Sequence, residues 1–249
     1  MNQIQVTGMV LSALPIGEYD KRIVILTKEK GKISAFARGA RRPNSQLAGA
    51  VMPFSFGEFV LYKGRSSYTV GSASISNYFS ELMEDVEAAY YAYYFVDVAG
   101  YYTREANDER EMLKLLYQTF RALVKKTIPF PLIRAIFELK TVTINGEGPQ
   151  VYQCLGCGTT EAGMKFSVRR GGLLCEKCRR GVFDAEILEN STLYAMQFVI
   201  SSPVEKLYTF RLSKEVMDQF ASLVKRYMQT YSEHKFKTLE ILEQLTALT

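Results

Sequence analysis

Four cysteines form the pattern in this sequence that is best suited to chemistry. Cys154 and Cys157 make one Cys-x-x-Cys pair, and Cys175 and Cys178 make a second pair after seventeen intervening residues. This spacing is typical of a four-thiolate zinc site, in which each pair directs two sulfurs at one ion and the intervening chain completes a tetrahedron. The sequence therefore predicts one structural Zn²⁺.

Two other roles for the cysteines stay open at this point, namely two disulfides or a redox-active Cys-x-x-Cys. Disulfides need an oxidising compartment, for which the sequence carries no address, and a redox motif does not require a second pair. Four protein ligands leave a metal no open position for water or substrate. The pattern therefore favours a scaffold over catalysis.

The segment around the cysteines is basic. Residues 150–183 carry six Lys/Arg against two Asp/Glu, a net charge of +4, but four thiolates with one Zn²⁺ contribute −2, so the effective charge is near +2. Its arginines, Arg169 and Arg170 among them, are expected either to contact DNA or to stabilise the thiolates.

A second cluster of cations lies in the stretch FARGARRPNS, residues 36–45. Arg38, Arg41 and Arg42 fall within five residues of a loop that contains Gly and Pro and no acid. Guanidinium groups can bind phosphates in pairs of hydrogen bonds or stack on bases. Further cations at expected strand starts and turns are predicted to join them on DNA: Lys21, Arg22, Lys63 and Arg65. The alternative is a solvated loop without a ligand.

Charge is segregated along the whole chain. Residues 1–79 carry +6 and residues 150–183 carry +4, whereas 80–149 carry −3 and 184–249 carry −2, which together give the formal +5. Clustered cations are what a polyphosphate backbone requires. The pattern indicates nucleic-acid binding, although a basic protein without such a ligand is the alternative.

Several function classes find no support in the sequence. There is no secretory signal and no apolar run of about 18 residues, so we expect a soluble, cytoplasmic protein. There is no G-x-x-x-x-G-K-[ST] phosphate loop and no grouping of nucleophile, base and oxyanion donors. The one histidine, His234, lies in a polar stretch and is expected at the surface. We therefore predict a binding protein and no enzyme.

The N-terminal third reads as five short strands. Short polar connections with glycine, KEKG and KGRS, separate the second strand from the third and the fourth from the fifth, as in hairpins. Five strands in about 80 residues predict a small closed barrel, for which an oligonucleotide-binding (OB) fold is the favoured candidate and an SH3-like barrel the rival. The expected strands span residues 4–15, 22–27, 32–38, 52–62 and 67–76.

Helical periodicity replaces strand alternation from residue 80. The first helix is expected to begin at Ser80 as N-cap and to bury a stripe comprising Leu82, Val86, Ala89, Tyr93, Val96 and Gly100. A second helix is expected with an Asp108–Glu111 capping box and a stripe of Met112, Leu115, Leu116, Thr119 and Leu123. A third starts near Pro129 or Pro131 and ends near Gly146, and later helices carry Ser191 and Ser213 as candidate caps. A run of tyrosines between residues 90 and 102 could offer stacking surfaces for bases, but a role in the core and in interfaces is favoured.

These readings predict an α+β multidomain protein. The expected domains are an OB-fold barrel over 1–79, a helical domain over 80–149 and 183–249, and an inserted zinc module over 150–182 whose metal replaces a core that so short a segment cannot build.

Taken together, the opening VTGMVLSALPIGEYDKRIVILTKEKGKISAFARGAR, the following GARRPNSQL, the helical segment and the C-x2-C…C-x2-C insertion resemble the bacterial RecO family of recombination mediators. The resemblance covers essentially the whole chain, including the late EHKFKTLEILEQL helix.

The resemblance implies a DNA repair protein that binds single- and double-stranded DNA and anneals complementary strands without ATP. It implies that the protein works with RecR, and often RecF, to load RecA onto strands coated by single-stranded DNA-binding protein (SSB), and that it is nucleoid-associated. It also implies contact with the acidic, hydrophobic-ended tail of SSB, for which a basic and apolar surface on the helical domain is expected. A zinc-stabilised protein-interaction adaptor with incidental DNA binding is the alternative, and a metal-dependent hydrolase is a third hypothesis.

Overall fold

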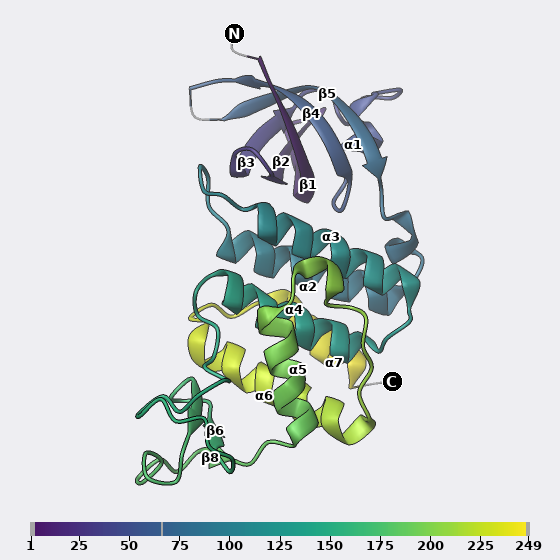
Figure 1. Ribbon diagram of the computed structural model, residues 1–249. Coiled ribbons are helices and arrows are strands. Elements are labelled where there is room, and N and C mark those ends of the chain that lie inside the picture. The colour runs from purple at the N-terminus through teal and green to yellow at the C-terminus, as the bar shows by residue number, and fades with distance from the viewer. Residues whose placement is uncertain (1–2, 66, 248–249) are drawn as a thin grey trace. The chain divides into compact units, whose positions relative to one another are not determined.

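The computed structural model describes residues 3–65 and 67–247. The chain forms two compact units (Figure 1), of which the first comprises residues 1–124 with 236–249 and the second comprises residues 125–235. This grouping differs from the predicted division at residues 79, 149 and 182, because helices on both sides of the second unit join the N-terminal barrel. Among the helices of the described residues, none is long and apolar enough to cross a membrane.

The N-terminal barrel closes as the strand alternation predicts. Its strands are β1 (Gln3–Ile16), β2 (Asp20–Thr27), β3 (Gly31–Ala37), β4 (Phe56–Lys63) and β5 (Tyr68–Asn77), in the order β1-β2-β3-β5-β4. β1 also pairs antiparallel with β4, which closes the barrel. β3 alternates buried and half-buried residues along its whole length, as a strand with one face in a core should. The predicted OB-like barrel is confirmed.

Two details of the barrel differ from the predictions. β4 starts at Phe56 and not at residue 52, because the chain before it forms the short helix α1 (Leu47–Ala50) and a turn in which Phe54 has a positive φ of 76°. β1 carries a bulge between Val10 and Ser12, which leaves Leu11 without a partner in β2. Leu11 is buried and faces Gly100 of the next helix, so the bulge turns one side chain from the strand toward the helices.

Helices complete the first unit. They are the 3-10 helix η1 (Ser80–Met83), α2 (Val86–Tyr102), α3 (Arg110–Lys125) and α7 (Lys237–Thr246). Phe54 from the barrel connection, Phe79 and Phe120 of α3 are all buried, and their rings meet edge to face at 5.2–5.3 Å. All five stripe residues predicted for α3 are buried, which confirms that stripe.

The predicted cap of the first helix is wrong, and its predicted stripe is buried only at Leu82 and Val96. Ser80 begins η1, and Asp85 is the N-cap of α2, where its carboxylate accepts from the N–H of Ala88 at 3.1 Å. η1 and α2 are separate helices, so a stripe counted from Leu82 enters α2 in the wrong register. Val86 and Tyr93 are exposed as a result. The expectation that the tyrosine run serves the core holds for Tyr91 and Tyr94, which are buried, while Tyr93 stays accessible and the other tyrosines of the run are half-buried.

The second unit is a helical cluster with a small sheet. Its elements are α4 (Phe130–Ile144), β6 (Lys165–Ser167), β7 (Gly172–Leu174), β8 (Ala185–Glu186), α5 (Asn190–Ser201), η2 (Val204–Lys206) and α6 (Lys214–Tyr231). α4 packs against both α5 and α6. The Lys140 ammonium donates to the carbonyls of Ile200 and Ser202 at 3.0 and 2.8 Å, which supplies partners to the last turn of α5.

Most of the helix caps predicted for this unit are found in the structure. Pro129 is the N-cap of α4, Gly146 follows its end with a φ of 81°, and the Ser213 hydroxyl accepts from the N–H of Val216, as predicted. The cap predicted at Ser191 is wrong, because α5 begins at Asn190 with Glu189 as its N-cap. In the first unit Asp108 accepts from the N–H and guanidinium of Arg110 in place of the predicted capping box.

We predict that Gly31→Ala destabilises the first unit more than Gly17→Ala. Both glycines have left-handed backbone, at φ 65° and 57°, which costs an alanine about 1–2 kcal/mol. A Cβ at Gly31 would also lie 2.2 Å from the carbonyl oxygen of Arg104, whereas one at Gly17 meets no heavy atom of the described chain within 4 Å. Urea unfolding should show a loss of roughly 3 kcal/mol for Gly31→Ala, because neighbouring hydrogen bonds are also strained. Equal losses in the two variants would contradict this packing.

Candidate metal centre and nucleic-acid interface

The four cysteine sulfurs converge on one point. The Sγ atoms of Cys154, Cys157, Cys175 and Cys178 all lie within 4.8 Å of one another. The Sγ atoms of Cys157 and Cys175 are 3.7 Å apart. A tetrahedral ion with metal–sulfur bonds of about 2.3 Å requires sulfurs about 3.8 Å apart, while a disulfide requires about 2.05 Å. The cluster can therefore hold one metal ion, and this distance does not fit a disulfide between these two cysteines.

Backbone pairing brings the two cysteine pairs together. Gln150 donates to Gly171 and accepts from Leu173, so the chain entering the first pair runs parallel to β7. The N–H of Leu155 then donates to the carbonyl of Leu173 at 2.8 Å, one residue before β7 ends and two before Cys175. The small strands β6, β7 and β8 were not predicted, because pairs and triplets of residues are too short to show alternation.

Gly156 allows the close approach of the sulfurs. A Cβ at this position would lie 2.7 Å from Sγ of Cys178, and its own N–H points at Sγ of Cys154 with a nitrogen–sulfur distance of 3.4 Å. The N–H of Cys175 approaches the same sulfur at 3.3 Å. Glycine therefore serves here to leave room for a sulfur and to expose a donor.

The pKa values of the thiols diverge because the sulfurs crowd together. Burial alone would raise the pKa of Cys154, but N–H groups of Cys175, Cys157 and Gly156 that donate to its sulfur lower the pKa to about 6. Hydrogen bonding with the other three thiols raises the pKa of Cys178 to about 12. All four sulfurs can lose their protons near neutral pH only beside a cation, which is the condition that a bound metal meets.

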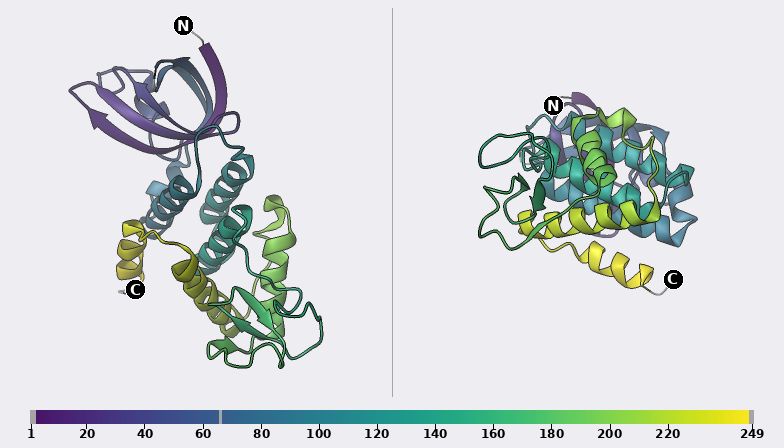
Figure 2. Two further views of the ribbon diagram at one scale, coloured as in Figure 1. Left: turned by 90° about the vertical axis from the view of Figure 1, so that its left-hand side faces the viewer. Right: turned by 60° about the horizontal axis from the view of Figure 1, so that its bottom comes forward.

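The segment that carries the four cysteines, residues 150–182, is hydrogen-bonded to the helices of its own unit (Figure 2), where the small sheet lies beside α5 and α6. The hydroxyl of Tyr227 donates to the carbonyl of Glu147 at 2.7 Å, and that of Tyr231 donates to the carbonyl of Arg169 at 3.3 Å. The two tyrosine rings stack with centroids 4.4 Å apart. Gln197 of α5 donates to Val151 at 2.7 Å. The module is thus anchored at both its entry and its β6–β7 turn.

Arg169 and Arg170 lie exposed in the β6–β7 turn. The carboxylate of Asp184 accepts from the backbone N–H of Arg169 at 2.9 Å and from the Ser167 hydroxyl at 2.8 Å, and these bonds fix the turn. The donors to the sulfur of Cys154 are the backbone N–H groups of Gly156, Cys157 and Cys175, so at this thiol the described hydrogen bonds come from the backbone and not from the arginines.

The arginine loop docks on the turn between β1 and β2. The N–H of Arg41 donates to the carbonyl of Tyr19 at 2.8 Å, and its guanidinium donates to the carbonyl of Gly17 at 3.2 Å. The N–H of Gly39 donates to the carboxylate of Asp20 at 2.7 Å. The Arg42 guanidinium carbon lies 5.2 Å from the centre of the Tyr19 ring, within the range of a cation–π contact.

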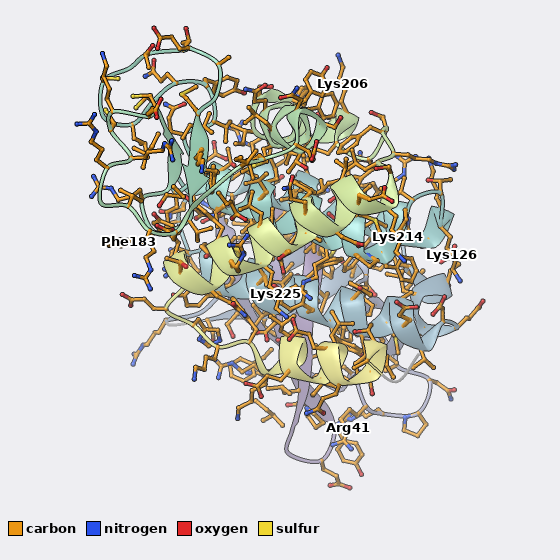
Figure 3. The ribbon with its side chains drawn as sticks, turned by 90° about the horizontal axis from the view of Figure 1, so that it is seen from below. Arg41, Lys126, Phe183, Lys206, Lys214 and Lys225 are labelled. Atoms are coloured by element: carbon orange, nitrogen blue, oxygen red, sulfur yellow. The ribbon has the colours of Figure 1, made fainter. Side chains whose placement is uncertain are left out.

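The loop is held from inside as well. Ala40 is buried in the barrel core, and the N–H groups of Arg42 and Ser45 donate to Gly39 and Arg42 in successive turns. Arg38, Arg41 and Arg42 are all exposed, and Figure 3 shows Arg41 on a loop at the margin of its unit. The loop therefore presents cations from an ordered backbone.

The structure brings Lys21 and Arg22 close to this loop. Both belong to the start of β2, where Lys21 pairs with Ala37 and Arg22 pairs with Phe36 of β3, just before the loop begins. The Lys21 ammonium lies 3.2 Å from the sulfur of Met52, and Arg22 donates to the Ser34 hydroxyl at 3.0 Å.

Lys63 and Arg65 lie on a different connection. They are exposed at the β4–β5 turn, and β5 starts beside Ala35 and runs parallel to β3. Lys63 pairs with Tyr68, which pairs with Ala35 inside β3, whereas the arginine loop leaves from the end of β3. The barrel cations thus form a cluster at the β1–β2 turn and a separate pair at the β4–β5 turn.

Sequence reasoning missed two features with functional potential. Tyr19 was not singled out, because its contact with Arg42 depends on the docking of two segments that lie more than twenty residues apart. The other is a cavity of about 640 Å³ in the second unit, between α5 and the segment before α6. Tyr194, Phe198, Phe210 and Arg211 are among its lining residues. The Phe–Arg pair at 210–211 was the available sequence signal.

Comparison with known proteins identifies the family. The family model of the recombination protein O N terminal matches residues 1–79, and that of the recombination protein O C terminal matches residues 83–240. A DNA repair protein RecO of Acetivibrio thermocellus is 32% identical over 247 residues, covering 98% of both chains. One of Alkaliphilus metalliredigens is 33% identical over 245 residues, covering 97% of this chain and 99% of its own. The chain, which has a barrel of OB type, helices and a four-cysteine cluster, therefore belongs to the RecO family of DNA repair proteins.

Proposed function

We propose that this protein is a recombination mediator that binds single- and double-stranded DNA and anneals complementary strands without ATP. With RecR, and with RecF, it helps load RecA onto single strands coated by SSB. The observation that supports this most directly is the ordered arginine loop docked beside the β1–β2 turn of an OB-like barrel. The protein acts by binding and positioning strands, and its metal serves the structure.

Charge and order of the barrel surface support the DNA-binding role. The β1–β2 turn and the arginine loop carry five cations, Lys21, Arg22, Arg38, Arg41 and Arg42, against the two carboxylates of Glu18 and Asp20. The N–H of Gly39 already bonds the Asp20 carboxylate. A surface whose backbone is ordered before binding loses little conformational entropy when phosphates arrive.

The cysteine cluster is proposed to hold one Zn²⁺. Four thiolates at tetrahedral spacing are a soft donor set that suits zinc, and a metal without an open position stabilises structure. The ion would contribute on the order of 10 kcal/mol to folding of a module that has only three very short strands. Arg169 and Arg170 are proposed as secondary DNA contacts because their turn is ordered and exposed.

The cavity beside α5 is proposed to receive the tail of SSB. Its aromatic walls, Phe198 and Phe210, meet edge to face at 5.2 Å, and Arg211 lies among the lining residues. Lys206 and Lys214, labelled in Figure 3, flank the lining segment in sequence. An apolar cavity beside cations is complementary to an acidic peptide with an apolar end.

The alternative function is a zinc-stabilised adaptor whose DNA binding is incidental. The tyrosine-anchored module with its fully exposed Phe183 favours it, because a free aromatic ring beside arginines is typical of protein-binding surfaces. A variant that has lost all DNA affinity but keeps partner binding and full repair activity in cells would establish the adaptor role.

For the DNA interface we predict a change in salt dependence. Replacing Arg38, Arg41 and Arg42 together by Ala should reduce the slope of log affinity against log salt by roughly 0.7 per lost phosphate contact on single strands. Replacing Arg110, Lys114 and Arg121 of α3 removes the same formal charge and should leave the slope near the wild-type value. Fluorescence anisotropy with a labelled oligonucleotide measures both. An unchanged slope in the loop variant would remove the loop from the interface.

For the metal we predict one zinc per chain by elemental analysis of reduced protein. Chelation, or acidification that protonates the thiolates, should release it and accelerate hydrogen exchange first in residues 150–183. Cys157→Ser should show the faster exchange already and respond little to the chelator. Absence of zinc from freshly purified reduced protein would contradict the assignment.

For the cavity we predict that Arg211→Glu weakens binding of a peptide with the SSB tail sequence by about tenfold or more, since charge reversal opposes an acidic ligand. Lys235→Glu, an exposed change in the same unit, should have little effect. Isothermal titration calorimetry measures the two affinities. Equal affinities in both variants would place the tail elsewhere.

A further inference from the structure

The β1–β2 turn carries exposed apolar side chains that phosphate binding does not explain. Leu14 is 63% exposed, Ile16 is 39% exposed and Tyr19 is 40% exposed. All three stand at the end of the hairpin on which the arginine loop docks. We call Leu14, Ile16, Tyr19 and Arg42 the hairpin platform.

Next to the platform, apolar side chains and cations alternate across the neighbouring strands. Leu14 pairs directly with Arg22 across the hairpin, so both side chains stand on the same outer face of the barrel. Arg22 in turn pairs with Phe36 of β3, which is half-buried on that face. A row of Leu14, Arg22 and Phe36 thus crosses three strands and ends beside the arginine loop.

Tyr19 and Arg42 are already organised as a stack. The guanidinium lies over the ring at 5.2 Å from its centre, while 40% of the tyrosine stays accessible. The backbone bond from Arg41 to Tyr19 at 2.8 Å holds the two partners in place. The Glu18 carboxylate bonds the Tyr19 hydroxyl and raises its pKa, so the ring stays neutral.

We propose that the hairpin platform binds unpaired bases of a single DNA strand, with a base stacked on Tyr19 and Arg42. This inference rests on the proposed DNA-binding function and adds the substrate class that the same surface prefers. Aromatic rings and guanidinium planes stack on any base, whatever its identity. The bases of a duplex are already stacked on one another, so the platform gains its contact only from a strand whose bases are free.

The charge of the site selects nucleic acid over a protein partner. The turn and loop carry five cations against two carboxylates, a net +3, within the stretches 18–22 and 38–42. An apolar protein surface docking here would have to desolvate these cations without partners, which is costly. A single strand supplies phosphates for the cations and base faces for the apolar groups at the same time.

The test compares two single strands of equal length, one of thymidines and one of abasic sites, which share phosphates but not bases. The full-length wild-type protein should bind the base-bearing strand more tightly. Tyr19→Ala should lower affinity for that strand by about fivefold or more and leave the affinity for the abasic strand and the salt slope unchanged. Tyr19→Phe should retain wild-type affinity, because the ring is kept. Arg42→Lys keeps the charge but not the plane and should show a partial loss confined to the base-bearing strand.

Tyr78→Ala is the matched control, because Tyr78 is 50% exposed and follows β5, away from the hairpin. It should leave both affinities unchanged. Equal weakening on both strands by Tyr19→Ala would mean that the ring only supports Arg42, and no change on either strand would assign the platform to another partner; both results overturn the proposal. Wild-type protein that binds both strands equally also overturns it while DNA binding stands, whereas binding to neither strand at low salt would refute the proposed function itself.

Discussion

The pairing of β1 on both of its sides is the constraint on which the first unit depends. Its first half pairs with β4 and closes the barrel, and its second half pairs with β2 and continues beyond the closure as a hairpin. The change of partner occurs near the bulge at Leu11, where Val10 exchanges backbone hydrogen bonds with Phe54 and Ser55. One strand thus closes the core, reaches the helices through Leu11 and extends the turn that receives the arginine loop. A shift of its register would disturb all three.

In the second unit, a short segment lacks a hydrophobic core of its own. Residues 150–183 are too few to bury a core of their own, and their strands are two or three residues long. Four converging cysteine sulfurs that can hold one metal ion lie where such a core would be, and Tyr227 and Tyr231 of α6 connect the segment to helices that do have a core. The cysteine cluster therefore lies where it can hold the shape of this segment. In the function we propose, DNA contact by this segment is made at the exposed turn of Arg169 and Arg170.

Features that depend on neighbouring residues could be predicted from the sequence, whereas features that depend on contacts between distant segments could not. Strand alternation such as GKISAFA and the paired Cys-x-x-Cys motifs are local patterns, so the barrel and the sulfur cluster could be predicted from them. The α2 stripe failed because a 3-10 helix interrupts the count after Met83. The docking of residues 38–42 on residues 17–20 uses the N–H of Arg41 on the carbonyl of Tyr19 and the N–H of Gly39 on the carboxylate of Asp20. The bond to Tyr19 involves only its backbone, so the tyrosine side chain had no sequence signal. The separation of Lys63 and Arg65 from the other barrel cations likewise depends on strand order.

We propose that this member of the RecO family brings complementary strands together by binding alone, through the barrel and its arginine loop. The most direct measurement is the rate at which SSB-coated complementary strands anneal with full-length protein in the absence of ATP, followed by fluorescence transfer between labelled ends. We expect annealing well above the protein-free rate, with strong inhibition as salt rises, because phosphate contacts release counterions. Annealing no faster than without protein, at low salt and saturating protein, would contradict it.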